Sequence, residues 1–140
     1  MAIVVFYEKP GCINNTRQKK WLRESGHEVI EKNLLTHGWE ASELKQYFAG
    51  LPVAQWFNAS APRVKSGEID PTELDPETAI ALMQAEPLLI RRPLMQVNGD
   101  RMVGFDEVAV DRWIGLVQRS QTDNLEVCAK SGTDTKSAMA

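Results

Sequence analysis

Residues 2–12 read Ala-Ile-Val-Val-Phe-Tyr-Glu-Lys-Pro-Gly-Cys, an apolar run followed directly by a turn. The run is nearly continuous and rich in β-branched and aromatic residues, which predicts a strand buried on both faces of an α/β sheet. From about Ile13 the apolar residues follow a helical pattern, and Gly26 suits the position just after a helix. Cys12 is therefore expected between the end of a buried strand and the start of a helix.

Two further patterns predict the rest of the sheet. Residues 28–32 alternate well enough for a second strand, and a strand, a helix and a strand in this order give two parallel strands with a right-handed crossover. Nearer the C-terminus, Asn98-Gly99 separates the apolar runs 94–97 and 101–104, which is the signature of a β-hairpin. The sequence thus predicts four strands in a mixed sheet.

An all-helical insert of roughly residues 39–90 is expected between the second strand and the hairpin. Helices are predicted over residues 40–49 and 52–57 and from Asp75 to about Glu86, with a polar loop over residues 58–67. The order of elements is that of the thioredoxin fold. We therefore expect a thioredoxin-like α/β fold, with a four-stranded mixed sheet and helices on both sides.

The C-terminal part of the chain changes character. Asp106 can cap a last helix that extends to about Gln118. After Arg119, polar and small residues dominate, and such a composition cannot bury enough apolar surface to order itself. The sequence predicts one domain over residues 1–118 and a disordered polar tail over residues 119–140.

Composition excludes several classes of function. The chain has 140 residues, 43% hydrophobic and 25% charged, with a net charge of −3. This mild acidity argues against nucleic acid, because a phosphate-binding surface needs clustered cations. No apolar run approaches the roughly 18 residues of a membrane span, and no basic segment precedes the first apolar run as in a signal peptide. We expect a cytoplasmic protein.

Cys12 is the residue that the sequence singles out for chemistry. The first N–H groups of a helix have no helical partner, and together with the helix dipole they favour a thiolate over a thiol. The alternative is a small buried residue without a role. Residue 15 is Asn, so the C-x-x-C motif is absent, and a redox cycle would need glutathione, a partner protein or Cys128. Cys128 falls in the predicted tail, where an incidental cysteine is the simpler interpretation.

The remaining candidates are residues that would bind an anion or a thiol partner beside Cys12. Arg91 and Arg92 precede Pro93, and Arg92 is expected to present its guanidinium to the site, whereas Arg91 is expected to be solvated or paired with Glu86 or Asp106. Lys9, Arg17 and Lys19 could add positive potential. The full set of candidate binding residues is Arg92, Pro93, Asn14, Asn15, Thr16 and Arg17.

Three stretches carry a resemblance to a known family. Lys9-Pro-Gly-Cys-Ile-Asn-Asn-Thr-Arg-Gln-Lys19, Pro52-Val-Ala-Gln-Trp-Phe-Asn58 and Ala61-Pro-Arg-Val-Lys-Ser-Gly67 resemble the nitrogenase-associated proteins, within the arsenate reductase ArsC and Spx-like group of thioredoxin folds. The resemblance covers about residues 2–118. It implies that Cys12 is a nucleophile, that Arg92 before a cis Pro93 binds an oxyanion, and that glutathione or a glutaredoxin is the reductant.

The sequence departs from the arsenate reductases at two positions. Two further arginines of the arsenate site fall on Asn58 and Gly104 in this chain. Each charge-assisted hydrogen bond to an oxyanion contributes about 1.5–3 kcal/mol, so the loss of two would slow the reaction by two to four orders of magnitude. Efficient arsenate reduction is therefore not expected, and no bound cofactor or metal is implied.

Two hypotheses follow for the function. The first is a thiol-dependent oxidoreductase in which Cys12 forms a mixed disulfide with glutathione or a glutaredoxin-type protein. The second is a non-catalytic binding or regulatory module, as the resemblance to Spx suggests. Its helical insert would contact nitrogenase or the nitrogenase assembly proteins, a partner that rests on the resemblance alone.

Overall fold

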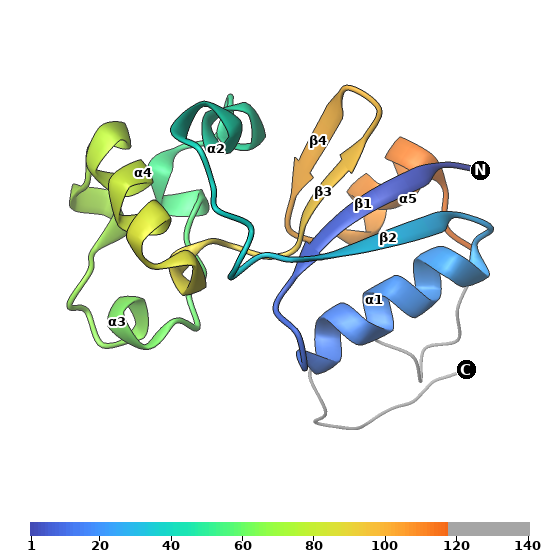
Figure 1. Ribbon diagram of the computed structural model, residues 1–140, viewed down its shortest axis with the longest axis horizontal. Helices are drawn as coiled ribbons and strands as arrows, with labels where there is room; N and C mark the ends of the chain where they lie inside the picture. Colours follow the sequence, from blue (N-terminus) through green and yellow to red (C-terminus); the bar gives the residue numbers. More distant parts are fainter. Residues whose placement is uncertain (118–140) are drawn as a thin grey trace.

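The computed structural model describes residues 1–117, which form one four-stranded sheet with helices on it and beside it (Figure 1). The sheet has the order β2-β1-β3-β4, in which β1 and β2 are parallel and the pairs β1–β3 and β3–β4 are antiparallel. The strands are β1 Ile3–Glu8, β2 Glu28–Asn33, β3 Leu94–Val97 and β4 Asp100–Val103. The predicted mixed sheet and its hairpin are confirmed.

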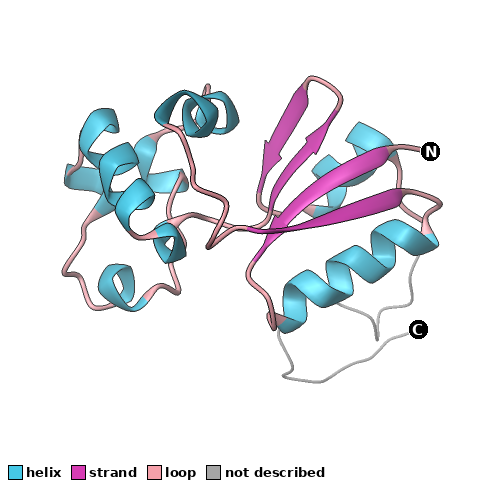
Figure 2. Cartoon of the chain, viewed as in Figure 1, coloured by secondary structure: helices cyan, strands magenta, loops and turns pink. Residues whose placement is uncertain are grey.

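The helices fall into two groups, as Figure 2 shows by secondary structure. Helices α1 and α5 cover one face of the sheet, and the other three belong to the insert, of which α2 lies against β4. The helices are α1 Ile13–Glu24, α2 Ala41–Phe48, α3 Pro62–Lys65, α4 Pro76–Ala85 and α5 Glu107–Ile114, with 3₁₀ turns η1 Val53–Gln55, η2 Pro71–Glu73 and η3 Pro87–Leu89.

Three predicted elements need correction. The polar loop expected over residues 58–67 contains α3, which begins at Pro62, and a single turn has too few residues for its apolar periodicity to be read. The helix expected over residues 52–57 is only the short 3₁₀ turn η1. The last helix ends at Ile114 rather than near Gln118, because Gly115 turns the chain with a φ of +88°.

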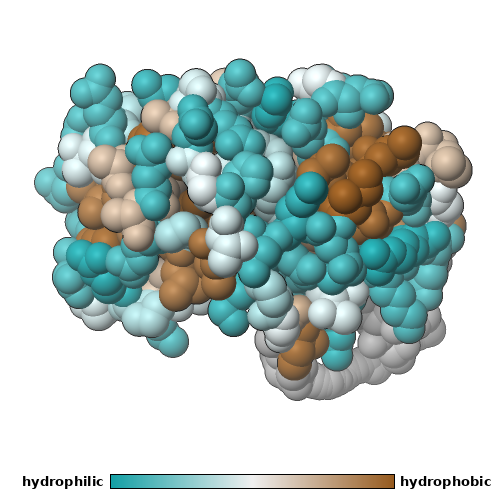
Figure 3. Space-filling model, viewed as in Figure 1, coloured by the Kyte–Doolittle hydropathy of each residue, from teal (hydrophilic) through white to brown (hydrophobic). Residues whose placement is uncertain are grey.

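The two faces of the sheet are buried differently. Val4 and Phe6 of β1 are fully buried in a core that α1 and α5 cover, with Trp21 and Val110. On the other face, Tyr7 joins the core of the insert. Ile3 on that face is 52% exposed, and Figure 3 shows an apolar area over β1, so β1 is buried on both faces only near its C-terminal end.

The strand pairing defines the edge of the sheet on which chemistry is expected. Tyr7 of β1 pairs with Leu94 of β3, and Leu94 pairs with Val103 of β4. The C-terminal ends of β1 and β4 and the start of β3 therefore meet at one edge. Cys12 follows the end of β1, Pro93 precedes the start of β3, and α5 follows the end of β4.

The disordered tail predicted over residues 119–140, with Cys128, lies outside the described residues. Within residues 1–117, no helix has both the length and the apolar character needed to span a membrane.

Candidate active site

Cys12 occupies the N-cap position of α1, directly after the turn that follows β1. Its backbone is extended, with φ −75° and ψ 120°, and its side chain makes no capping hydrogen bond. The residue is partly buried and carries a free thiol. The first turn of α1 contains no acidic residue, so the positive end of the helix dipole is not offset there by a carboxylate. Cys12 therefore lies between strand and helix, where the sequence placed it.

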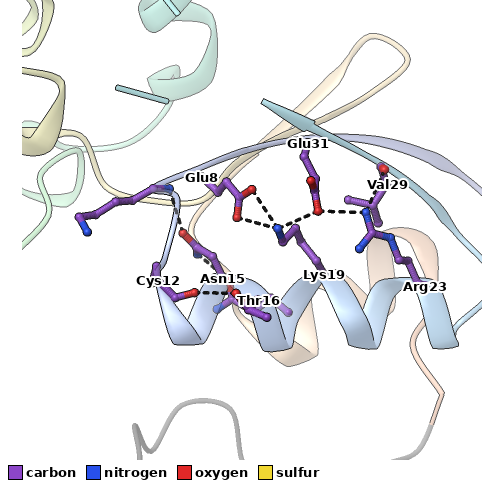
Figure 4. Close-up of polar contacts among 10 residues, drawn as sticks. Glu8, Cys12, Asn15, Thr16, Lys19, Arg23, Val29 and Glu31 are labelled. Atoms are coloured by element: carbon purple, nitrogen blue, oxygen red, sulfur yellow. Dashed lines mark hydrogen bonds and ion pairs between the residues drawn. The ribbon is translucent and has the colours of Figure 1, made fainter. Parts of the chain in front are cut away.

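The loop that carries Cys12 is held by its own hydrogen bonds (Figure 4). The Cys12 N–H donates to the Lys9 carbonyl at 3.1 Å, and the Cys12 carbonyl accepts from the N–H and the hydroxyl of Thr16, each at 3.0 Å. The buried side chain of Asn15 accepts from the Lys9 N–H at 3.2 Å and donates to Gln18 at 3.0 Å. Asn15 and Thr16 therefore position Cys12, and the binding role predicted for them stays a prediction.

The two other candidates on α1 have different surroundings. The side chain of Arg17 is exposed. Asn14 is partly buried, and its Oδ1 is shielded from solvent without a hydrogen-bond partner within residues 1–117. An unpaired buried acceptor costs free energy until a donor reaches it. Asn14 is thus a candidate on α1 with a buried oxygen that lacks a donor among the described residues.

Arg92 and Pro93 lie at the same edge of the sheet as Cys12. The Arg92–Pro93 peptide bond is cis, as predicted. Pro93 immediately precedes the Leu94 that pairs with Tyr7 of β1, so it sits across from the loop that follows β1. The Nε of Arg92 is buried without a hydrogen-bond partner among the described residues. The geometry therefore brings one incompletely bonded guanidinium to the edge where Cys12 lies.

Arg91 differs from the expectation that it would be solvated or paired with Glu86 or Asp106. Its Nη1 donates to the Gln55 carbonyl at 3.3 Å, and its guanidinium lies against Gly104. A Cβ added at Gly104 would lie 2.8 Å from Nη2 and 2.9 Å from Nε of Arg91. Gly104 also has a φ of +77°, which favours glycine. The side chain of Arg91 therefore fills the space that a side chain at position 104 would need.

Two polar side chains of the insert, Arg63 and Asn58, have partners of their own. Arg63 forms ion pairs with Glu68 and Glu86. Asn58 accepts from the Ser60 N–H at 3.1 Å and donates to the Leu88 carbonyl at 3.4 Å. Both side chains therefore have their partners within the insert.

An ion cluster behind the Cys12 loop was not foreseen. Lys19 on α1 contacts Glu8 of β1 at 2.9 Å and Glu31 of β2 at 2.8 Å, and Arg23 contacts Glu31 at 3.2 Å (Figure 4). Glu8 and Lys19 are only 8% and 9% exposed. The charge of Lys19 is therefore compensated within the sheet, and the prediction that it adds positive potential at the site is corrected.

The titration of the ion cluster reflects these contacts. Burial lowers the pKa of Lys19, but the hydrogen bonds to Glu31 and Glu8 outweigh burial and hold the pKa above its ordinary value. The hydrogen bond from Lys19, and then that from Arg23, lowers the pKa of Glu31. The sequence signal that was available is a carboxylate on each of the two parallel strands, Glu8 and Glu31, on the face that a helical lysine can reach.

Comparison with known proteins agrees with the fold. The sequence model of the ArsC family matches residues 7–113. An "Uncharacterized 15.7 kDa protein in draG 3'region" of Rhodospirillum rubrum is 49% identical over 138 residues, covering 99% of this chain and 96% of its own length.

Two further relatives connect the chain to known structures and to a regulator. The crystal structure of an ArsC family related protein from Bacteroides fragilis is 27% identical, with a TM-score of 0.69 over 78% of this chain and 97% of its own. The global transcriptional regulator Spx 2 of Bacillus cereus is 24% identical over 80% of this chain and 87% of its own.

Proposed function

This chain belongs to the ArsC family, and from that premise we propose that it is a thiol oxidoreductase whose Cys12 forms a mixed disulfide with glutathione or with a glutaredoxin-type protein. The observation that carries the proposal is the free thiol at the uncapped start of α1. The half-buried Arg92, whose Nε has no partner within residues 1–117, supports an anionic partner. A reducing compartment such as the cytosol, which the composition led us to expect, would keep this thiol available.

The proposed step is a thiol–disulfide exchange. The Cys12 thiolate attacks one sulfur of oxidised glutathione, a bond forms between the two sulfurs, and the original disulfide bond breaks. The second glutathione leaves as a thiolate and takes up a proton from water. Cys12 is thereby oxidised to the mixed disulfide, and one half of the glutathione disulfide is reduced. The uncapped N–H groups at the start of α1 stabilise the attacking thiolate.

Arsenate is not the substrate that we propose. Of the three arginines that the resemblance to arsenate reductases implies, only Arg92 is present, and Asn58 is engaged in its own loop. The guanidinium of Arg91 lies against Gly104. Arg91, however, stands at a different position of the sequence from the arginine that Gly104 replaces. We therefore propose a thiol or disulfide substrate rather than an oxyanion of arsenic.

Intact-mass measurement after incubation with oxidised glutathione tests the proposal. We expect one glutathione adduct on the wild-type chain and none at residue 12 in Cys12→Ser. The matched control is Cys128→Ser, which removes the other cysteine and should retain the adduct. Absence of any adduct on the wild type, or an equal adduct on Cys12→Ser, would overturn the proposal.

A second candidate is a binding module in which Cys12 does not turn over. The likeness to Spx 2, a transcriptional regulator, favours it. We further propose, from the three stretches that resemble nitrogenase-associated proteins, that the partner belongs to nitrogen fixation and is nitrogenase or one of its assembly proteins.

Complementation separates the two candidates. In a nitrogen-fixing host whose homologous gene is deleted, growth on dinitrogen should require the wild-type chain, and Cys12→Ser should fail to restore it. Full complementation by Cys12→Ser would favour the module and contradict the oxidoreductase. Normal growth of the deletion strain would contradict the link to nitrogen fixation.

A further inference from the structure

The outer edge of β2 faces no other strand among residues 1–117 (Figure 1). In the sheet order β2-β1-β3-β4, β2 is an edge strand that pairs with β1, and five of its six residues are exposed. The other edge strand, β4, lies against α2 of the insert. An edge strand presents a row of unpaired N–H and C=O groups, which a further strand can bind. β2 is therefore the edge at which this sheet can be extended.

The backbone groups that point away from the sheet belong to the odd-numbered residues of β2. The Glu28 N–H donates to the Ala2 carbonyl at 2.9 Å, and the Leu34 N–H donates to the Glu8 carbonyl at 2.8 Å. The even-numbered residues of β2 therefore face β1, and the residues between them face outward. A strand that joins this edge in the antiparallel direction must set its own outward residues opposite the odd-numbered ones.

A second copy of β2 meets this condition when the two strands pair about a two-fold axis at one of the interior positions 29–32. An axis at Glu31 or Lys32 sets two like charges directly opposite each other, which is destabilising. An axis at Val29 sets the carboxylate of Glu28 opposite the apolar Ile30. An axis at Ile30 sets Glu28 of each copy opposite Lys32 of the other copy. Charge complementarity therefore selects the register about Ile30.

The register about Ile30 also joins the apolar parts of the open sheet face. Val5 of β1 pairs with Ile30 of β2, so the row of these two residues continues into the same two residues of the second copy. In an antiparallel pair, opposite residues whose backbone groups point away from the partner have Cα atoms about 4.5 Å apart, the closer of the two spacings. Ile30, which is 38% exposed in the single chain, then packs on its own copy between two charge pairs.

Arg23 lies at this edge without closing it. Its Nη2 donates to the outward carbonyl of Val29 at 3.4 Å and contacts Glu31 at 3.2 Å. The first contact is long, and a carbonyl oxygen has two lone pairs, so the Val29 carbonyl can also accept a strand N–H. Glu31 keeps Lys19 and Arg23 as its partners on the face that α1 covers. Joining the two strands therefore requires no ion pair of the single chain to break.

We infer that this protein forms a symmetric dimer in which the β2 strands of two copies pair antiparallel about Ile30. The two four-stranded sheets thereby become one continuous sheet. The two β1 strands then run in opposite directions, so the Cys12 loops that follow them lie at opposite ends of the joined sheet. Each copy keeps its own Cys12 site, and the inference does not depend on the proposed function.

Sedimentation equilibrium of the full chain measures the dimer. A thiol reductant is present, so that a disulfide between two copies does not contribute. A contact built on one strand of each copy is small, so the samples span about 10 μM to 1 mM. We expect a reversible monomer–dimer equilibrium within that range. A monomer at every concentration would overturn the inference.

Charge reversals test the register. Glu28→Lys and Lys32→Glu each set like charges opposite one another on both sides of the axis, and each should raise the dissociation constant at least about tenfold. The double variant restores opposite charges and should return to within about threefold of the wild type. An equimolar mixture of the two single variants should form mixed dimers, since each supplies the charge that the other lacks. A double variant as weak as the single ones would exclude this register and overturn the inference.

Two further variants complete the test. Ile30→Lys places two like charges at the axis and should weaken the dimer at least as much as a charge reversal. The control Lys45→Glu changes the net charge as Lys32→Glu does, at an exposed position of α2, and should leave the dissociation constant unchanged. Circular dichroism checks the fold of each variant, and all four positions are exposed. An equal effect of Lys45→Glu and Lys32→Glu would show repulsion by net charge, and would also overturn the inference.

Discussion

The starts of α1 and α5 lie at the same edge of the sheet and on the same face, yet they are stabilised in different ways. At α5, Asp106 Oδ1 accepts from the Val108 and Ala109 N–H groups at 3.0 and 3.2 Å. At α1, Cys12 caps nothing, and the helix is held two turns later by Lys19. A side-chain cap consumes the donors at a helix start. Anchoring α1 further along its length leaves those donors for a reacting sulfur.

Removing the anchor of α1 should have the largest effect on stability. In Lys19→Met the buried carboxylate of Glu8 loses its partner, and breaking a buried ion pair in this way costs about 3 kcal/mol or more. Urea denaturation followed by circular dichroism measures the loss. If α1 does not depend on this anchor, the midpoint will hardly move.

A double variant shows whether the unpaired charge is the cause. Glu8→Gln combined with Lys19→Met leaves no buried charge without a partner. It should recover a substantial part of the stability that Lys19→Met loses. A double variant as unstable as the sum of the single ones would instead indicate that packing of the lysine stem dominates.

Removing the cap of α5 should have the next largest effect. Asp106→Ala takes away the acceptor of two N–H groups and should destabilise the fold by about 1 kcal/mol. Asp106→Asn keeps the acceptor and should stay near the wild type, and thermal unfolding of both variants checks this. An equal loss in the two variants would mean that the negative charge, rather than the cap, stabilises the start of α5.

The sequence predicted the fold well where one residue type imposes local geometry. Asn98-Gly99 predicted the hairpin through its backbone conformation, and Asp106 predicted the start of α5 through its side-chain cap, because each acts on neighbouring residues of the chain. It predicted less well where an element is very short or ends at a single glycine. The turn at Pro62 is too short for a periodic signal, and the end of α5 is set by the positive φ of Gly115.

The candidate site was predicted only in part, for a similar reason. Cys12 was placed correctly because its position between strand and helix is local. Lys19 was misjudged because its partners Glu8 and Glu31 come from two different strands. Arg91 was misjudged because the space for its guanidinium arises from the glycine at position 104, on the far side of the hairpin.

Giving α1 a side-chain cap tests the difference between the two helix starts at α1. Cys12→Asp supplies the acceptor that α1 lacks and should stabilise the protein by about 0.5 kcal/mol relative to Cys12→Ala. Both variants remove the thiol, so the difference between them isolates the cap. Equal thermal stability would show that the N–H groups at the start of α1 are already satisfied and are not available to stabilise a thiolate.

The smallest effect should come from the exposed end of the ion cluster. The side chain of Glu31 is 45% exposed, so its pairs with Lys19 and Arg23 contribute less than about 1 kcal/mol. Because its pKa is lowered in the folded state by the hydrogen bond from Lys19, its contribution is present above the ordinary value of 4.5 and is lost as the pH falls through the folded value. At neutral pH, Glu31→Gln should therefore be slightly less stable than the wild type, and the gap should close in acid. A gap that persists at low pH would show that Glu31 acts through packing, and that the anchor of α1 consists of Glu8 and Lys19 alone.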